Sequence, residues 1–161
     1  FCHPELSMQE TYSSRRLAGF LESEGFEVCW GTGGFETAFT AEWGSGRPVI
    51  GFLAEYDALP GLAQECVPEQ KGSGGPGHGC GHNLLGSACA GAACALKDRM
   101  AEEGMEGTVR VYGCPAEEIV VGKIRMNEQG VFDDLSAAVT WHPFDRNRVS
   151  YDIWQAQAIK N

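Results

Sequence analysis

A glycine-rich hexapeptide, Gly77-His78-Gly79-Cys80-Gly81-His82, holds the densest group of possible metal ligands in the chain. A thiolate and an imidazole two residues apart point the same way if the segment is extended. The interleaved glycines also allow the backbone to fold tightly around an ion. The alternative interpretation is a flexible loop that carries a free thiol. The density of ligand-type side chains favours the metal site.

Two adjacent carboxylates, Glu117 and Glu118, follow an apolar stretch and the dipeptide Pro115-Ala116. In a metallohydrolase, one such carboxylate ligates the ion and its neighbour takes a proton from water. Adjacent residues of a strand point to opposite faces, so this division of roles requires the chain to turn at the pair. A solvated acidic pair at a helix N-terminus is the alternative, and it is the better explanation of the pair taken alone.

Three further candidates each have an ordinary structural explanation when considered singly. His142 precedes Pro143 at the end of an apolar run, where a histidine is more often structural than a ligand. Glu55 and Asp57 follow another apolar run, so they either orient an imidazole or cap a strand.

Regular elements must bring these residues together. The sequence predicts a helix over Met8–Gly25 and a long helix over Asn83–Glu103, with Asn83 as its N-cap and Gly104 as its stop. The other predicted elements are a loop at Gly72–Gly81, a helix near Gly122–Gln129, and strands at Phe26–Trp30, Phe35–Trp43, Pro48–Ala54, Thr108–Tyr112 and Ala137–Trp141. The segment that ends at Lys160-Asn161 also reads like an incoming strand.

Strands that alternate with helices predict an α/β layered domain with a largely parallel sheet. In such sheets, ligands gather at the loops beyond the carboxyl ends of the strands. Asp57, the Glu117-Glu118 pair and His142 each follow a predicted strand, so we expect several separate loops to converge on one rim.

Composition limits the possible functions. The 161 residues, 43% of them hydrophobic, suffice for one globular domain, and no apolar run reaches the roughly 20 residues that cross a bilayer. A net charge of −10 argues against nucleic acid as a partner. Seven scattered cysteines are unlike a disulfide scaffold and predict a reducing, cytoplasmic compartment, with Cys89 and Cys94 buried in the long helix. The chain opens on Phe1, so we expect it to be a segment of a longer protein.

Together these motifs resemble the M20 family of metallopeptidases and amidohydrolases, and in particular its aminoacylase, carboxypeptidase-like and aminobenzoyl-glutamate-hydrolase subfamily. The order and the intervals of the motifs match over nearly the whole chain. The matching stretches are His3-Pro4-Glu5-Leu6-Ser7, Glu55-Tyr56-Asp57-Ala58-Leu59-Pro60, Gly77 to Asn83, Pro115-Ala116-Glu117-Glu118, Gly130 to Asp134, and Trp141-His142-Pro143.

The resemblance implies a three-layer α/β catalytic domain with a largely parallel mixed sheet, which binds one or two divalent ions, zinc or manganese. It implies four metal ligands, which are Cys80, His82, Glu118 and His142. It further implies that Glu117 is the general base acting on water, and that Asp57 is a carboxylate supporting the metal site. Many relatives carry Asp at the positions of Glu55 and Asn83, so the charge around the ligands is altered here.

The expected reaction is hydrolysis of an amide bond in an N-acyl amino acid, an aminobenzoyl-glutamate-like compound or a dipeptide. On this resemblance, residues 1–161 are the N-terminal part of the catalytic domain. The inserted dimerisation domain and the C-terminal part, with a last ligand histidine, lie beyond them, so we expect the chain alone to have little or no activity. The complete protein would be a homodimer or a heteromer. Two alternatives stay open, a non-catalytic subunit of a heteromeric amidohydrolase and a hydrolase with Cys80 as nucleophile.

Overall fold

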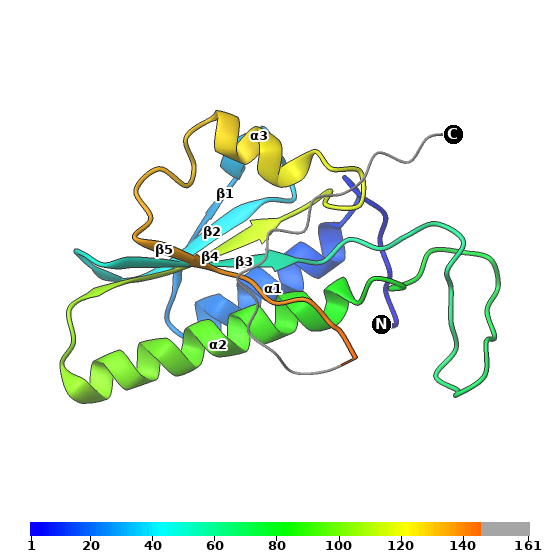
Figure 1. The fold of residues 1–161 in the computed structure, drawn as a ribbon, viewed down its shortest axis with the longest axis horizontal. Helices are drawn as coiled ribbons and strands as arrows, with labels where there is room; N and C mark the ends of the chain where they lie inside the picture. The colour runs from blue at the N-terminus through cyan, green and yellow to red at the C-terminus, as the bar shows by residue number, and fades with distance from the viewer. Residues whose placement is uncertain (146–161) are drawn as a thin grey trace.

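A five-stranded sheet in the order β1-β2-β4-β3-β5 organises the chain. The structure is a computed structural model and describes residues 1–145 (Figure 1). In chain order the elements are α1 (Thr11–Ser23), β1 (Glu27–Trp30), the short 3₁₀ helix η1 (Thr32–Gly34), β2 (Phe39–Ser45), β3 (Val49–Glu55), α2 (His82–Glu103), β4 (Gly107–Cys114), α3 (Gly122–Glu128) and β5 (Ala137–Val139).

The sheet is mixed, and its parallel half carries the predicted site. β4 and β5 flank β3 and both run parallel to it, whereas the pairs β1–β2 and β2–β4 are antiparallel. The carboxyl ends of β3, β4 and β5 therefore meet at one edge of the sheet, as the sequence predicted. The α/β class with a mixed sheet is confirmed.

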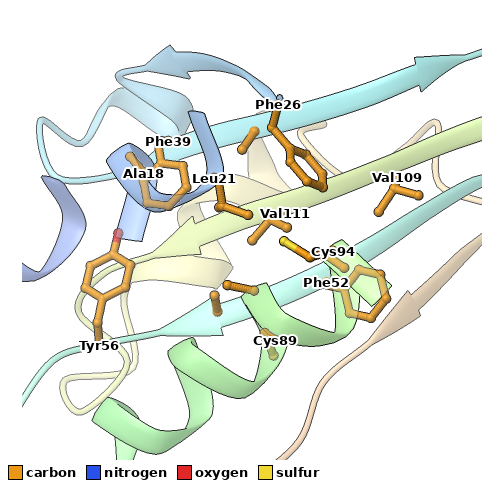
Figure 2. Packing of buried hydrophobic residues seen from close by; sticks show 14 of the residues in the cluster. Ala18, Leu21, Phe26, Phe39, Phe52, Tyr56, Cys89, Cys94, Val109 and Val111 are labelled. Carbon is orange, nitrogen blue, oxygen red and sulfur yellow. The ribbon is translucent and has the colours of Figure 1, made fainter. Parts of the chain in front are cut away.

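Helices cover both faces of this sheet and make three layers (Figure 1). Strand β4 shows why, because its side chains alternate between two apolar clusters. Val109 and Val111 point into the apolar cluster between the sheet and the helices α1 and α2 (Figure 2). Tyr112 and Cys114 point the other way, into a smaller cluster with Met126 of α3.

Small residues bring α2 very close to the sheet. Ala90 and Ala93 are almost fully buried against it, as are Cys89 and Cys94, which confirms their expected role as small apolar residues. The Cys89 thiol also donates a hydrogen bond to the carbonyl oxygen of Leu53. At Gly86 an added Cβ would lie 2.5 Å from the carbonyl oxygen of Glu55, so only glycine fits there. This close contact fixes the start of α2 beside the end of β3.

Two helix starts differ from the sequence prediction. Helix α1 begins at Thr11 rather than Met8, because Met8 has a φ of 70° and the Glu5 carboxylate accepts the free backbone N–H groups of Tyr12 and Ser13. Helix α2 begins at His82, so the prediction of Asn83 as its N-cap was wrong. Its N-cap is the preceding glycine, which makes no side-chain cap.

The strands also shift by a few residues. β2 starts at Phe39, four residues later than predicted, because residues 35–38 remain in a turn, in which the Ala38 N–H donates to the Phe35 carbonyl oxygen. β5 ends at Val139 rather than Trp141. The predicted strand near Lys160-Asn161 lies outside the described residues. Among residues 1–145, no helix combines the length and apolar character that crossing a membrane requires.

Candidate metal centre

The predicted site residues converge at the edge where the three parallel strands end. Glu55 is the last residue of β3, and Asp57 lies two residues beyond it. The Glu117-Glu118 pair follows β4, and His142 follows β5. Cys80 and His82 reach the same edge from the loop that leads into α2.

Cys80 and His82 converge through a turn, and not through the extended segment that the sequence suggested. Gly81 between them has a φ of 79°, a left-handed conformation that disfavours any side chain. An added Cβ there would also lie 2.8 Å from Pro143, next to His142. The glycine therefore allows the start of α2 and the loop after β5 to pack against each other.

Three possible ligands lie within bonding range of a common ion. The thiol sulfur of Cys80 is 3.2 Å from Nε2 of His142, and the ring of His142 meets that of His82 edge-on with centroids 6.0 Å apart. One ligand atom from each of the three lies within 4.8 Å of the other two. Nδ1 of His142 is 3.0 Å from the carbonyl oxygen of Pro143, which can only accept a hydrogen bond, so the ring proton lies on Nδ1 and Nε2 keeps the lone pair that a ligand nitrogen needs.

Asp57 fixes the orientation of His82. Both side chains are fully buried, and Oδ1 of Asp57 is 2.8 Å from Nδ1 of His82. Its other oxygen accepts hydrogen bonds from the Ser7 hydroxyl at 2.7 Å and the Glu118 backbone N–H at 2.9 Å. Burial alone raises the pKa of Asp57, but these three hydrogen bonds hold it below its ordinary value of 3.8. The carboxylate is therefore charged and holds the Nδ1 proton of the ring.

The other nitrogen of His82 is a buried polar atom without a hydrogen-bond partner in the described part of the chain. Oε2 of Glu55 is 3.1 Å away and Oε2 of Glu117 is 3.7 Å away, but neither makes a hydrogen bond with it. A buried nitrogen in this state is costly unless something binds it. Together with a thiol, a second imidazole and carboxylates, it is a donor set that fits Zn²⁺.

The chain turns sharply at Glu117 and Glu118. Such a turn is required if one carboxylate is to act as a base while its neighbour binds the ion. Ala116 has a φ of 56°, and the Val120 N–H closes the turn on the carbonyl oxygen of Glu117 at 2.7 Å. Oε1 of Glu118 is 3.7 Å from Nδ1 of His82, whereas Glu117 lies near the other nitrogen of that ring. Both carboxylates therefore face the same imidazole.

Negative charge dominates the electrostatics of the site. Burial, followed by the charges of Glu118 and Glu117, raises the pKa of the Cys80 thiol to about 11. Burial also raises the pKa of Glu118. A reactive cysteine needs an electropositive environment that stabilises its thiolate, and this one is electronegative. The surroundings of Cys80 suit a thiolate that is paired with a cation rather than a free nucleophile.

Sequence reasoning missed three residues that support the site. Ser7 lies in a matching motif, but nothing in the pattern indicates its hydrogen bond to Asp57. Glu10 is fully buried, and its carboxylate accepts the Ala116 N–H at 2.8 Å, which pins the turn before the acidic pair. Lys123 of α3 donates a hydrogen bond to Glu55. All three contacts join residues that are far apart in the sequence.

Comparisons with known proteins agree with this geometry. Residues 51–154 match the peptidase family M20/M25/M40. The chain is 51% identical to one of the subunits of p-aminobenzoyl-glutamate hydrolase from Escherichia coli strain K12, over 88% of the chain and 30% of that protein. It is 38% identical to the human Xaa-Arg dipeptidase, over 89% of the chain and 34% of that protein. The chain thus spans about a third of the length of these relatives.

A solved structure has the same fold. The Bacillus subtilis YXEP protein, described as a dinuclear metal-binding peptidase from the M20 family, superposes with a TM-score of 0.71 and 36% identity. The match covers 84% of this chain and 38% of that one.

Proposed function

The chain belongs to the peptidase family M20/M25/M40, and we propose that the complete protein is a metal-dependent hydrolase of amide bonds. The observation that carries this proposal is the convergence of Cys80, His82 and His142, which bring a sulfur and two imidazole nitrogens within 4.8 Å of one another. Cys80 and His82 lie at the start of α2 and His142 lies in the loop after β5. The buried Nε2 of His82 has no hydrogen-bond partner in the described residues.

The residues that would hold the ion are Cys80, His82, His142 and Glu118. A bound divalent ion supplies Lewis-acid polarisation of the scissile carbonyl and makes water a better nucleophile at neutral pH. Thiol and imidazole ligands suit zinc, and the nearby carboxylates also suit manganese. The dinuclear relative from Bacillus subtilis supports one or two ions.

Glu117 is the proposed general base. Its side chain is 36% exposed, so it can reach a water and a substrate, unlike the buried Asp57. In the proposed reaction its carboxylate takes a proton from the attacking water and then delivers that proton to the leaving amine. Asp57 is buried and acts through its neighbours, by holding the ring of His82 at Nδ1 and accepting the backbone N–H of Glu118.

The proposed substrates are N-acyl amino acids, aminobenzoyl-glutamate-like compounds or dipeptides. Two relatives support this class, since one is named for aminobenzoyl-glutamate and the other for a dipeptide with arginine. The Escherichia coli relative is named as one subunit of its hydrolase, which supports a heteromer for the complete protein, with a homodimer as the alternative.

The test is Glu117→Gln in the complete protein, with Glu128→Gln on the exposed surface of α3 as a control of equal charge change. We expect Glu117→Gln to lose at least about a hundredfold in kcat on an aminobenzoyl-glutamate or dipeptide substrate while its metal content stays unchanged. The control keeps full activity. Most of the activity remaining in Glu117→Gln refutes the base assignment.

A second measurement separates the hydrolase from its alternatives. Removal of metal with a chelator should abolish turnover, and added Zn²⁺ or Mn²⁺ should restore it. Activity that resists the chelator but is lost on alkylation of Cys80 would favour a cysteine nucleophile. A metal-loaded protein without activity on any amide would favour a non-catalytic subunit.

A further inference from the structure

Two groups of side chains could each hold an ion, and both depend on His82. One consists of Cys80, His82 and His142, and the other of Glu55, His82 and Glu117. Geometry alone does not choose between them, because the ligand atoms of each group lie within 4.8 Å of one another. The second group is richer in carboxylates, which favour harder cations than a thiol does.

His82 can serve only one of these groups at a time. Its Nδ1 is engaged by Asp57 at 2.8 Å, which leaves Nε2 as its free nitrogen. An imidazole nitrogen has a single lone pair and therefore binds one ion. An ion can bind in the second group only if Glu55 is available as a ligand. The contacts of Glu55 therefore determine which group the nitrogen of His82 serves.

Lys123 restrains Glu55. The first residues of α3 lie over the carboxyl end of β3, and the Lys123 ammonium donates a hydrogen bond to Oε1 of Glu55. The Glu55 side chain is only 9% exposed and that of Lys123 is 30% exposed, so water screens this ion pair weakly. The other carboxylate oxygen of Glu55, Oε2, stays open and faces Nε2 of His82 at 3.1 Å. The charge of the ammonium on the same carboxylate disfavours a second cation there.

We propose that Lys123 is a positioning residue of the metal centre. Its ammonium balances the charge of Glu55, which makes this carboxylate a poor ligand although it lies beside His82, and leaves the free nitrogen of His82 to the ion bound by Cys80 and His142. This inference rests on the proposed metal-dependent function. It implies that the centre presents sulfur and nitrogen rather than a majority of carboxylate oxygens, so Zn²⁺ is preferred over Mn²⁺.

Metal binding by the complete protein tests this inference without any activity measurement. The protein is stripped of metal, and Zn²⁺ and Mn²⁺ affinities are measured by competition with a chromophoric chelator, with the ions per chain counted by mass spectrometry. The variants are Glu55→Gln, Lys123→Met, Lys123→Arg and the double variant Lys123→Met/Glu55→Gln. Cys80→Ser serves as the ligand control.

Glu55→Gln should bind as many ions as the wild type, whereas Cys80→Ser should bind fewer or bind Zn²⁺ much more weakly. In Lys123→Met the released carboxylate becomes available to a cation, so Mn²⁺ affinity should rise about tenfold. Lys123→Arg keeps a cation beside Glu55 and should behave as the wild type does. The double variant should return to wild-type Mn²⁺ affinity, which a purely structural role of Lys123 does not predict.

Loss of an ion in Glu55→Gln would make Glu55 a ligand and overturn the inference. Unchanged Mn²⁺ affinity in folded Lys123→Met would overturn it as well. If Lys123→Met does not fold, the ion count of Glu55→Gln decides alone. A wild-type protein that binds no ion at all would instead refute the proposed function, together with the inference that rests on it.

Discussion

Replacing Gly86 by alanine tests how tightly α2 is pressed onto the sheet. The new Cβ would lie 2.5 Å from the carbonyl oxygen of Glu55, which is a backbone atom and cannot rotate away. Helix and strand must therefore separate by roughly 0.5–1 Å, and overpacking of this kind costs about 1–3 kcal/mol. The same substitution at Gly91, in the same helix, meets no heavy atom within 4 Å.

Gly91→Ala is the matched control. Alanine in place of glycine inside a helix stabilises the protein by about 0.5–1 kcal/mol, and both variants receive this gain. The difference between their free energies of unfolding therefore isolates the contact with Glu55, and we expect Gly86→Ala to be less stable by about 1–3 kcal/mol. Urea denaturation of the complete protein, followed by circular dichroism, measures this difference.

The same displacement should reach the metal centre. His82 lies one turn before Gly86, and its hydrogen bond to Asp57 joins the helix to the strand end. We expect Gly86→Ala to weaken Zn²⁺ binding by about tenfold, because metal affinity depends on how the ligands are oriented. If Gly86→Ala and Gly91→Ala are equally stable and bind Zn²⁺ equally well, the close contact between helix and sheet does not position the site.

Three other perturbations have defined outcomes. Asp57→Asn should lower the free energy of unfolding by about 1.5–3 kcal/mol, since a buried charged acceptor of three hydrogen bonds is lost. Urea denaturation measures this loss, and an unchanged urea midpoint would contradict it. Val120→Asn should raise the free energy of unfolding by about 0.5–1 kcal/mol, because Val120 has a φ of 56°, which asparagine tolerates better than a β-branched residue. Thermal denaturation measures this change. A lower melting temperature would argue against backbone strain at Val120. Burial raises the pKa of Glu10 above 4.5, so the folded state favours its neutral form. The free energy of unfolding of the wild type, relative to that of Glu10→Gln, should therefore fall as the pH rises from about 4.5 through the raised pKa. Urea denaturation at a series of pH values measures this difference. A difference that stays constant or rises would refute the raised pKa of Glu10.

Much of the fold could be predicted because the local pattern and the packing agree. The apolar run of β3 and the small residues of α2 each lie in the predicted element, since a strand covered on both faces and a closely packed helix have distinctive compositions. The helix starts were less predictable. At Thr11 the boundary is set by the Glu5 carboxylate, and at His82 by a left-handed glycine, neither of which follows from hydrophobic periodicity.

The sequence indicated which residues lie near one another at the site more than how they are arranged. Types and spacing identified Cys80 and His82, and the resemblance to the M20 family added His142. The structure brings the ligand atoms of these three residues together. The sequence suggested an extended Cys80–His82 segment, whereas a turn at Gly81 achieves the convergence. Lys123 could not be found from the sequence, because a lysine on a short helix looks like any surface residue until its partner Glu55 is placed in space.

The first ten residues do more for the site than their position suggests. Ser7 and Glu10 contribute no ligand, yet one holds the carboxylate that orients His82 and the other anchors the turn that presents the acidic pair. A variant that lacks residues 1–10 would keep the four proposed ligands Cys80, His82, Glu118 and His142 and still have a poorly organised centre. The metal centre therefore depends on a segment that supplies none of its proposed ligands.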